Sequence, residues 1–134
     1  MQPHSWVTIV TLVALLVYLW MAFRVGGARK KSGINAPAMT GDPALERHIR
    51  VQVNTLEWLP IFLPSLWLFA IYWSDLVATV LGVIWIFGRI IYALGYAASP
   101  EKREIGFIIQ ALATLVLLLG ALGRAIWMLT VVGA

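Results

Sequence analysis

Long apolar runs separated by short polar segments dominate the pattern along this chain. The first run extends from Ser5 to Phe23 and contains no charged residue. Such a run is about long enough to cross the ~30 Å hydrocarbon core of a bilayer as a helix. Later runs predict three more helices, over about 43–73, 76–97 and 100–122 or longer. We therefore expect an all-α, integral membrane four-helix bundle that forms one domain over residues 1–134.

Polar residues at the boundaries of these runs predict where the helices start. Asp42 followed by Pro43 offers an N-cap and a proline at the first helical position. Ser99 followed by Pro100 repeats that signal before the last run. The segment 24–40, which is rich in glycine and basic residues, is expected to be a loop.

The composition agrees with a membrane protein and excludes other classes. Hydrophobic residues make up 61% of the chain and charged residues 12%, against about 25% charged in a soluble domain. This balance excludes a disordered chain and an ordinary soluble enzyme. The absence of cysteine excludes a disulfide-stapled domain, a protein thiolate nucleophile and a Cys-ligated metal site. No His or carboxylate pair has the spacing of metal ligands, so we expect no metal site.

The net charge of +4 is interpreted as a topology signal and not as a nucleic-acid surface. Basic residues gather in the first connection and in the third, so the positive-inside rule predicts that both face the cytoplasm, with both termini opposite. Arg124 disagrees with this arrangement. Lys30 and Lys31 are interpreted as topology determinants or lipid-headgroup contacts. His48 is expected to face solvent or headgroups, and His4 is expected to have no role.

Polar residues within the second apolar run share one helical face. At about 100° per residue they fall within an arc of roughly 80°: Arg47, Arg50, Asn54 and Glu57. A charge near the bilayer centre costs about 2.5–3.5 kcal/mol, so Glu57 should face protein or water. It either pairs with Arg50 or Arg89 to hold helices together or belongs to a functional site.

The third run and the start of the fourth add a second polar set. Arg89, Tyr92 and Tyr96 again fall on one face of a helix. Arg103 follows in the first turn of the last helix, across the connection from Tyr96. We expect these residues and those of the second helix to converge on a polar pocket near the cytoplasmic side.

The order of these residues resembles a known signature. The segment Glu46-Arg47-x-x-Arg50-x-Gln52-x-Asn54-x-x-Glu57, followed by Pro60, is similar to that of the MAPEG family, the membrane-associated proteins in eicosanoid and glutathione metabolism. Gly41, Arg89-x-x-Tyr92-x-x-Gly95-Tyr96 and Arg103 keep the order and spacing of its leukotriene synthase branch. The similarity covers about residues 22–103.

The resemblance implies a homotrimer that binds glutathione between neighbouring subunits. Arg103 would be the catalytic residue, beside the sulfur, where it stabilises the thiolate. Gln52 would contact glutathione held mainly by the adjacent subunit. The full set of residues expected to bind glutathione is Arg50, Gln52, Asn54, Glu57, Arg89, Tyr92 and Tyr96.

Elementary chemistry is consistent with these assignments. Glutathione carries two carboxylates and one ammonium, which Arg50 and Glu57 can match in charge. A thiol has an ordinary pKa of about 8.5 and reacts as the thiolate. A cation at a helix N-terminus, as Arg103 is, favours that anion.

These residues predict a membrane-bound glutathione transferase or peroxidase that acts on a hydrophobic electrophile or lipid hydroperoxide. It would lie in a bacterial inner membrane or in the endoplasmic reticulum. One alternative is a non-enzymatic lipid-binding or scaffold protein of the same fold. Another is a small proton-coupled multidrug exporter, which would need Glu57 free to exchange a proton, although Glu57 shares its face with Arg50 and Asn54.

Overall fold

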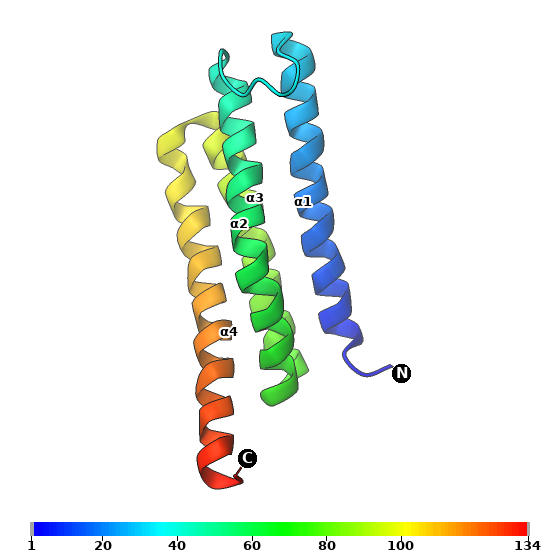
Figure 1. Ribbon diagram of the computed structural model, residues 1–134, viewed down its shortest axis with the longest axis vertical. Helices are drawn as coiled ribbons and strands as arrows, with labels where there is room; N and C mark the ends of the chain where they lie inside the picture. The colour runs from blue at the N-terminus through cyan, green and yellow to red at the C-terminus, as the bar shows by residue number, and fades with distance from the viewer. Residues whose placement is uncertain (1, 134) are drawn as a thin grey trace.

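The computed structural model describes residues 2–133 and contains four long α-helices, with no strand among these residues (Figure 1). The helices are α1 (Ser5–Ser32), α2 (Pro43–Tyr72), α3 (Asp75–Ala98) and α4 (Glu104–Val131), and the short 3₁₀ helix η1 (Pro100–Arg103) precedes α4. The predicted all-α class is confirmed. Each helix is long and apolar enough to cross a membrane.

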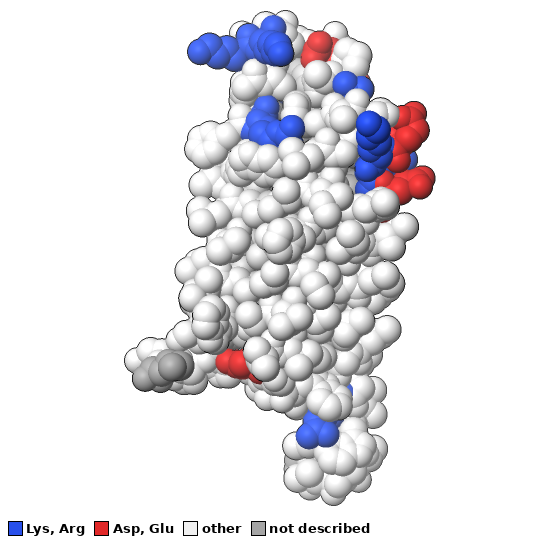
Figure 2. Space-filling model, turned by 180° about the vertical axis from the view of Figure 1, so that it is seen from behind, with Lys and Arg blue, Asp and Glu red and all other residues white. Residues whose placement is uncertain are grey.

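The helices run up and down, so both termini lie at one end of the bundle and the α1–α2 and α3–α4 connections lie at the other (Figure 1). α2 and α3 each pack against the other three helices, and α1 and α4 lie on opposite flanks of that pair. Charged side chains gather mainly at the end with the α1–α2 and α3–α4 connections, and the face in Figure 2 shows a wide uncharged belt between the two ends. This distribution matches a bundle whose middle lies in hydrocarbon.

The helix α1 is longer than the sequence predicts. We expected a loop from Arg24, but the helix continues to Ser32 and ends at Gly33, which has a positive φ of 77°. The apolar run marks the part of the helix that matches the hydrocarbon core, and arginine, lysine and alanine continue the helix into the polar region. Basic residues in its last turn also interact favourably with the helix dipole.

The predicted helix starts differ in how they are capped. The side chain of Asp42 accepts a hydrogen bond from the backbone N–H of Leu45 at 2.9 Å, which confirms the predicted N-cap of α2. Ser99 precedes the 3₁₀ turn in extended conformation, but its hydroxyl donates to the carboxylate of Glu101 and makes no cap bond. α3 starts at a cap that we did not predict, in which Ser74 accepts from the N–H of Val77.

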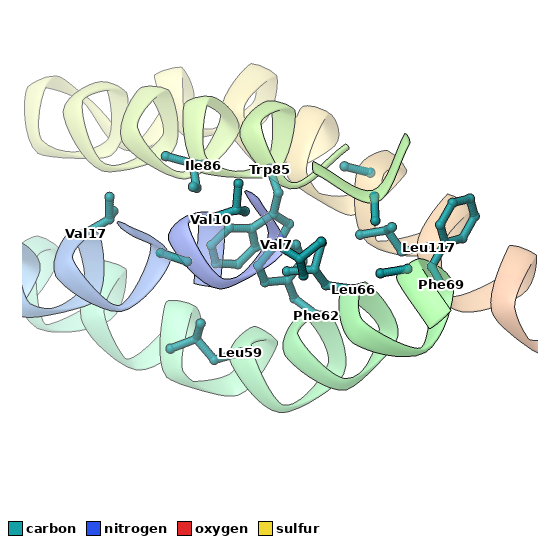
Figure 3. Close-up of a cluster of buried hydrophobic side chains, with 14 of the residues drawn as sticks. Val7, Val10, Val17, Leu59, Phe62, Leu66, Phe69, Trp85, Ile86 and Leu117 are labelled. Carbon is teal, nitrogen blue, oxygen red and sulfur yellow. The ribbon is translucent and has the colours of Figure 1, made fainter. Parts of the chain in front are cut away.

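A layer of aromatic and branched side chains fills the centre of the bundle (Figure 3). The rings of Phe62 on α2 and Trp85 on α3 stack with centroids 4.0 Å apart and planes 3° from parallel. Val7 and Val10 of α1 and Leu66 of α2 surround this pair. The burial of such large side chains fixes the relative positions of the first three helices.

One expectation at the terminal end of the bundle is wrong. His4 was expected to have no role, but its Nδ1 lies 2.7 and 2.9 Å from the carboxylate oxygens of Asp75. Its ring also meets the edge of Trp67, at a centroid distance of 5.9 Å. Because α1 and α3 start at the same end of the bundle, the topology brings together two residues that are far apart in sequence.

Candidate functional site

A hollow of about 250 Å³ opens between α2, α3 and the start of α4, toward the end of the bundle that carries the α3–α4 connection. We call it the inter-helix cavity. Polar and aromatic side chains line it: Arg50, Asn54, Tyr92, Tyr96, Arg103, Glu104 and Phe107. Three separate helical segments therefore build one site.

The helix α2 supplies the first two polar groups of the cavity. Arg50 and Asn54 are four residues apart and so lie one turn apart on the same face. Arg50 is exposed and Asn54 is half-buried. A guanidinium and an amide therefore face the same space at two depths.

Behind this wall lies the fully buried side chain of Arg89, of which 0% is exposed. Its Nη1 and Nη2 donate to Oδ1 of Asn54 at 2.9 and 3.0 Å. Its guanidinium carbon also lies 4.9 Å from the ring centroid of Tyr92 and 5.7 Å from that of Trp85. Since Oδ1 accepts both bonds, the amide Nδ2 of Asn54 is left to donate toward a ligand.

Two tyrosines of α3 form the aromatic side of the cavity. Tyr92 is buried and Tyr96 is half-buried, and their rings meet edge to face with centroids 5.7 Å apart. Phe107 of α4 lies 6.2 Å from Tyr92, centroid to centroid. The cavity thus has a mixed polar and aromatic wall.

Arg103 lies at the mouth of the cavity, in an exposed position at the start of α4. Its Nη1 donates to the carbonyl of Pro100 at 2.9 Å. Its guanidinium carbon lies 5.4 Å from the ring centroid of Tyr96. These contacts hold a cation where the N–H groups of α4 also favour negative charge.

Close backbone contact between α3 and α4 brings Arg103 to this place. A Cβ atom on Gly106 would clash with the backbone of Tyr92 and with the carbonyl of Gly88. A Cβ atom on Gly88 would lie 2.8 Å from the backbone nitrogen of Gln110. Only glycine at these two positions permits the close approach of α3 and α4.

The structure brings together five of the residues that we assigned to the site and separates three others. Arg50, Asn54, Tyr92, Tyr96 and Arg103 line the cavity. Arg89 does not reach it and instead contacts Asn54 from behind. Glu57 lies further along the Arg50–Asn54 face and is exposed, and Gln52 is half-buried elsewhere on α2.

The expected pairing of Glu57 with Arg50 or Arg89 is not observed. Among residues 2–133, the ion pair present is that of His4 with Asp75, at the other end of the bundle. Arg89 uses the amide of Asn54 as its partner instead. A neutral acceptor can reach the buried guanidinium because Asn54 lies on the side of α2 that faces α3.

Sequence reasoning missed two residues of the cavity. Glu104 follows Arg103 directly, and Phe107 lies one helical turn after Arg103. The signal that could have identified Phe107 is its i to i+4 spacing from Arg103, which puts both residues on one face of a helix. Among the described residues there is no group of three or more His, Asp or Glu side chains that could hold a metal ion.

Comparisons with known proteins agree with the geometry. A family model described as MAPEG family matches residues 7–123. An uncharacterized protein of Synechocystis sp., sll1147, is 47% identical over 124 residues, which cover 92% of this chain and 90% of that protein. Microsomal glutathione S-transferase 2 of Homo sapiens is 39% identical over 117 residues, covering 87% and 80%. Leukotriene C4 synthase of Bos taurus is 34% identical over 125 residues, covering 93% and 75%.

Proposed function

This chain belongs to the MAPEG family, and we propose that it is a glutathione transferase of the membrane. It would activate the thiol of glutathione for attack on a hydrophobic electrophile, or for reduction of a lipid hydroperoxide. The observation that carries the proposal is the convergence of Arg50, Asn54, Tyr92, Tyr96 and Arg103 on one cavity. The protein itself is an integral membrane protein with four membrane-spanning helices.

The charges of the cavity suit a ligand that has two carboxylates and one ammonium. Arg50 can bind a carboxylate with two parallel hydrogen bonds. The Nδ2 group of Asn54 can donate to the same carboxylate or to a peptide carbonyl, because Arg89 occupies its Oδ1. Glu104, on the cavity wall, supplies negative charge for the ammonium, and Glu57, further along α2, would add to it where a neighbouring subunit completes the site.

Arg103 is proposed to stabilise the thiolate. It is the cation at the start of α4, and the helix dipole adds to its effect. Both favour the deprotonated form of a thiol and so lower its pKa from about 8.5. The thiolate sulfur then bonds to the electrophilic carbon as the leaving group departs with its electron pair. A protein without cysteine can perform thiol chemistry in this way.

A homotrimer is part of the proposal, and Glu57 supports it. This carboxylate lies halfway along α2 and is exposed in a single chain. Facing lipid would cost it about 2.5–3.5 kcal/mol. A neighbouring subunit that covers this face would shield Glu57, and Gln52 of one subunit could then contact glutathione in the next.

We also propose that the connections rich in basic residues lie on the cytoplasmic side. Arg29, Lys30 and Lys31 lie in the last turn of α1, and Lys102 and Arg103 lie in η1, at the same end of the bundle. The positive-inside rule then puts the inter-helix cavity near the cytoplasm, where glutathione would enter from water and the electrophile from the bilayer.

Isothermal titration of the purified protein in detergent with glutathione tests the proposal. Binding should occur, and the protein should conjugate glutathione to a halonitrobenzene. If glutathione does not bind, the proposal fails. Thermal stabilisation by a fatty acid, without any by glutathione, would instead favour a lipid-binding protein of the same fold.

A further inference from the structure

A second hollow, of about 450 Å³, lies between the last third of α1 and the start of α2, and we call it the basic pocket. It shares no residue with the inter-helix cavity. Its lining consists of Arg24, Gly27, Ala28, Lys31, Ser32, Asp42, Ala44 and His48. Nothing in the proposed transferase chemistry uses this set.

Arg24 is a partly buried cation on the wall of the basic pocket. Its Nη1 is buried and has no hydrogen-bond partner among the described residues. The guanidinium carbon lies 4.8 Å from the ring centroid of Trp20, which holds the side chain in place. A buried donor without an acceptor is costly, by about 1–3 kcal/mol or more for a charged group. Arg24 lines the pocket, so an anion there would offset part of the cost of burying its charge.

The other groups around the pocket favour negative charge. Lys31 lies seven residues after Arg24 on the same face of α1 and adds a second cation, and His48 adds a ring nitrogen from α2. Asp42 is the one carboxylate of the lining, and it already accepts a hydrogen bond from the N–H of Leu45. The hydroxyl of Ser32, also in the lining, donates to the carbonyl of Arg29 and accepts from the N–H of Ile34.

The neighbouring basic residues are placed differently. Nη1 of Arg29 donates to the carbonyl of Ala38 at 2.7 Å and to that of Ile34 at 3.4 Å, so this side chain closes the α1–α2 loop. Lys30 is exposed and does not line the pocket. Of the basic residues in this part of α1, Arg24 and Lys31 therefore line the pocket, and Arg29 and Lys30 do not.

The depth of the pocket matches the phosphate layer of a bilayer. The uncharged run from Ser5 to Phe23 spans about 28 Å as a helix, close to the thickness of the hydrocarbon core. Arg24, the next residue, therefore lies where hydrocarbon gives way to headgroups. Trp20 lies one turn deeper, in the interfacial region that tryptophan prefers.

We propose that the basic pocket binds a phosphate group, carried by an anionic lipid headgroup or by a small phosphate compound. Arg24 and Lys31 would donate charge-assisted hydrogen bonds to the phosphate oxygens, with His48 as a further donor. The bound phosphate would link the end of α1 to the start of α2. None of these residues lines the inter-helix cavity.

Native mass spectrometry of the full chain in detergent tests this proposal. The probes are a phosphatidylglycerol of defined chains, inorganic phosphate and glycerol 3-phosphate. Two variants act on the pocket, Arg24→Gln by removing charge and Gly27→Leu by filling space. Two matched controls act beside it: Lys30→Gln, and Gly26→Leu. A Cβ on either glycine meets no atom within 4 Å, so both leucine variants should fold.

We expect both pocket variants to weaken binding of at least one probe about tenfold, while the controls keep the wild-type affinity. Binding of phosphatidylglycerol alone identifies the ligand as a headgroup, and competition by glycerol 3-phosphate or inorganic phosphate identifies a soluble one. If no probe binds, or if the pocket variants bind as the controls do, the proposal is wrong. Because glutathione titration is a separate measurement, this result does not depend on the proposed transferase activity.

Discussion

The guanidinium of Arg89 donates to Oδ1 of Asn54 through two nitrogens, at 2.9 and 3.0 Å. This contact joins α3 to α2 inside the bundle, with Arg89 fully buried. It also settles which end of the amide of Asn54 is occupied, and so which end a ligand in the inter-helix cavity would meet. Arg89 is therefore best understood as a residue that positions Asn54.

Replacement of Asn54 by alanine should destabilise the protein. The variant leaves a buried guanidinium without its acceptor, and hydrogen bonds to charged groups contribute about 1.5–3 kcal/mol. We expect a lower Tm in detergent and a weaker affinity for glutathione in titration. The matched control Val53→Ala changes an exposed neighbour on the same helix and should leave both values near those of the wild type. Equal Tm values for the two variants would show that the Arg89–Asn54 contact contributes little.

Replacement of Arg103 by alanine should reduce turnover more than binding. Loss of the cation raises the pKa of the bound thiol, so less thiolate is present at neutral pH. We expect kcat for a halonitrobenzene to fall about 10- to 100-fold and the rise of the pH–rate profile to move to higher pH. The pH at which the absorbance of the thiolate appears should rise as well.

The matched control for this change is Lys102→Ala, which removes the adjacent exposed cation outside the inter-helix cavity. It should keep the wild-type pH profile. An unchanged profile in Arg103→Ala would remove Arg103 from the chemistry.

Replacement of Glu57 by glutamine should weaken glutathione binding only if subunits assemble. In a single chain Glu57 lies outside the cavity wall, so its effect depends on a neighbour that completes the site. We expect native mass spectrometry to give the mass of a trimer, and the KM for glutathione to rise about tenfold in Glu57→Gln. Glu101→Gln, an exposed change on η1, is the control and should leave KM unchanged. A monomeric mass for the active wild-type protein would contradict the shared site.

Replacement of Gly106 by alanine should open the contact between α3 and α4. The added Cβ would press on the backbone of Tyr92 and on the carbonyl of Gly88, neither of which can move without a shift of a helix. We expect a lower Tm together with a loss of glutathione-dependent activity. Gly123→Ala provides the control, because a Cβ there meets no atom within 4 Å. That change should be neutral or stabilising by up to about 1 kcal/mol, and similar behaviour of the two variants would exclude this account of the helix contact.

Much of the fold could be predicted from the sequence because helices depend on local properties. Apolar runs matched to the thickness of a bilayer determine four membrane-spanning segments, and Asp42 with Pro43 marks the start of α2. The end of α1 was missed because the transition from apolar to polar residues shows where hydrocarbon ends, and a helix can continue past that point.

For the candidate site, the sequence predicts which residues of one helix share a face. Helical periodicity alone determines that Arg50 and Asn54 share a face, and that Tyr92 and Tyr96 do, since 3.6 residues per turn is a property of a single helix. Which face meets which is a property of packing between helices. The tertiary structure decided that Arg89 contacts Asn54 and not Glu57, that Glu104 and Phe107 complete the cavity, and that His4 meets Asp75. These outcomes depend on the close approach at Gly88 and Gly106 and on the shapes of buried side chains, which act between residues far apart in the chain.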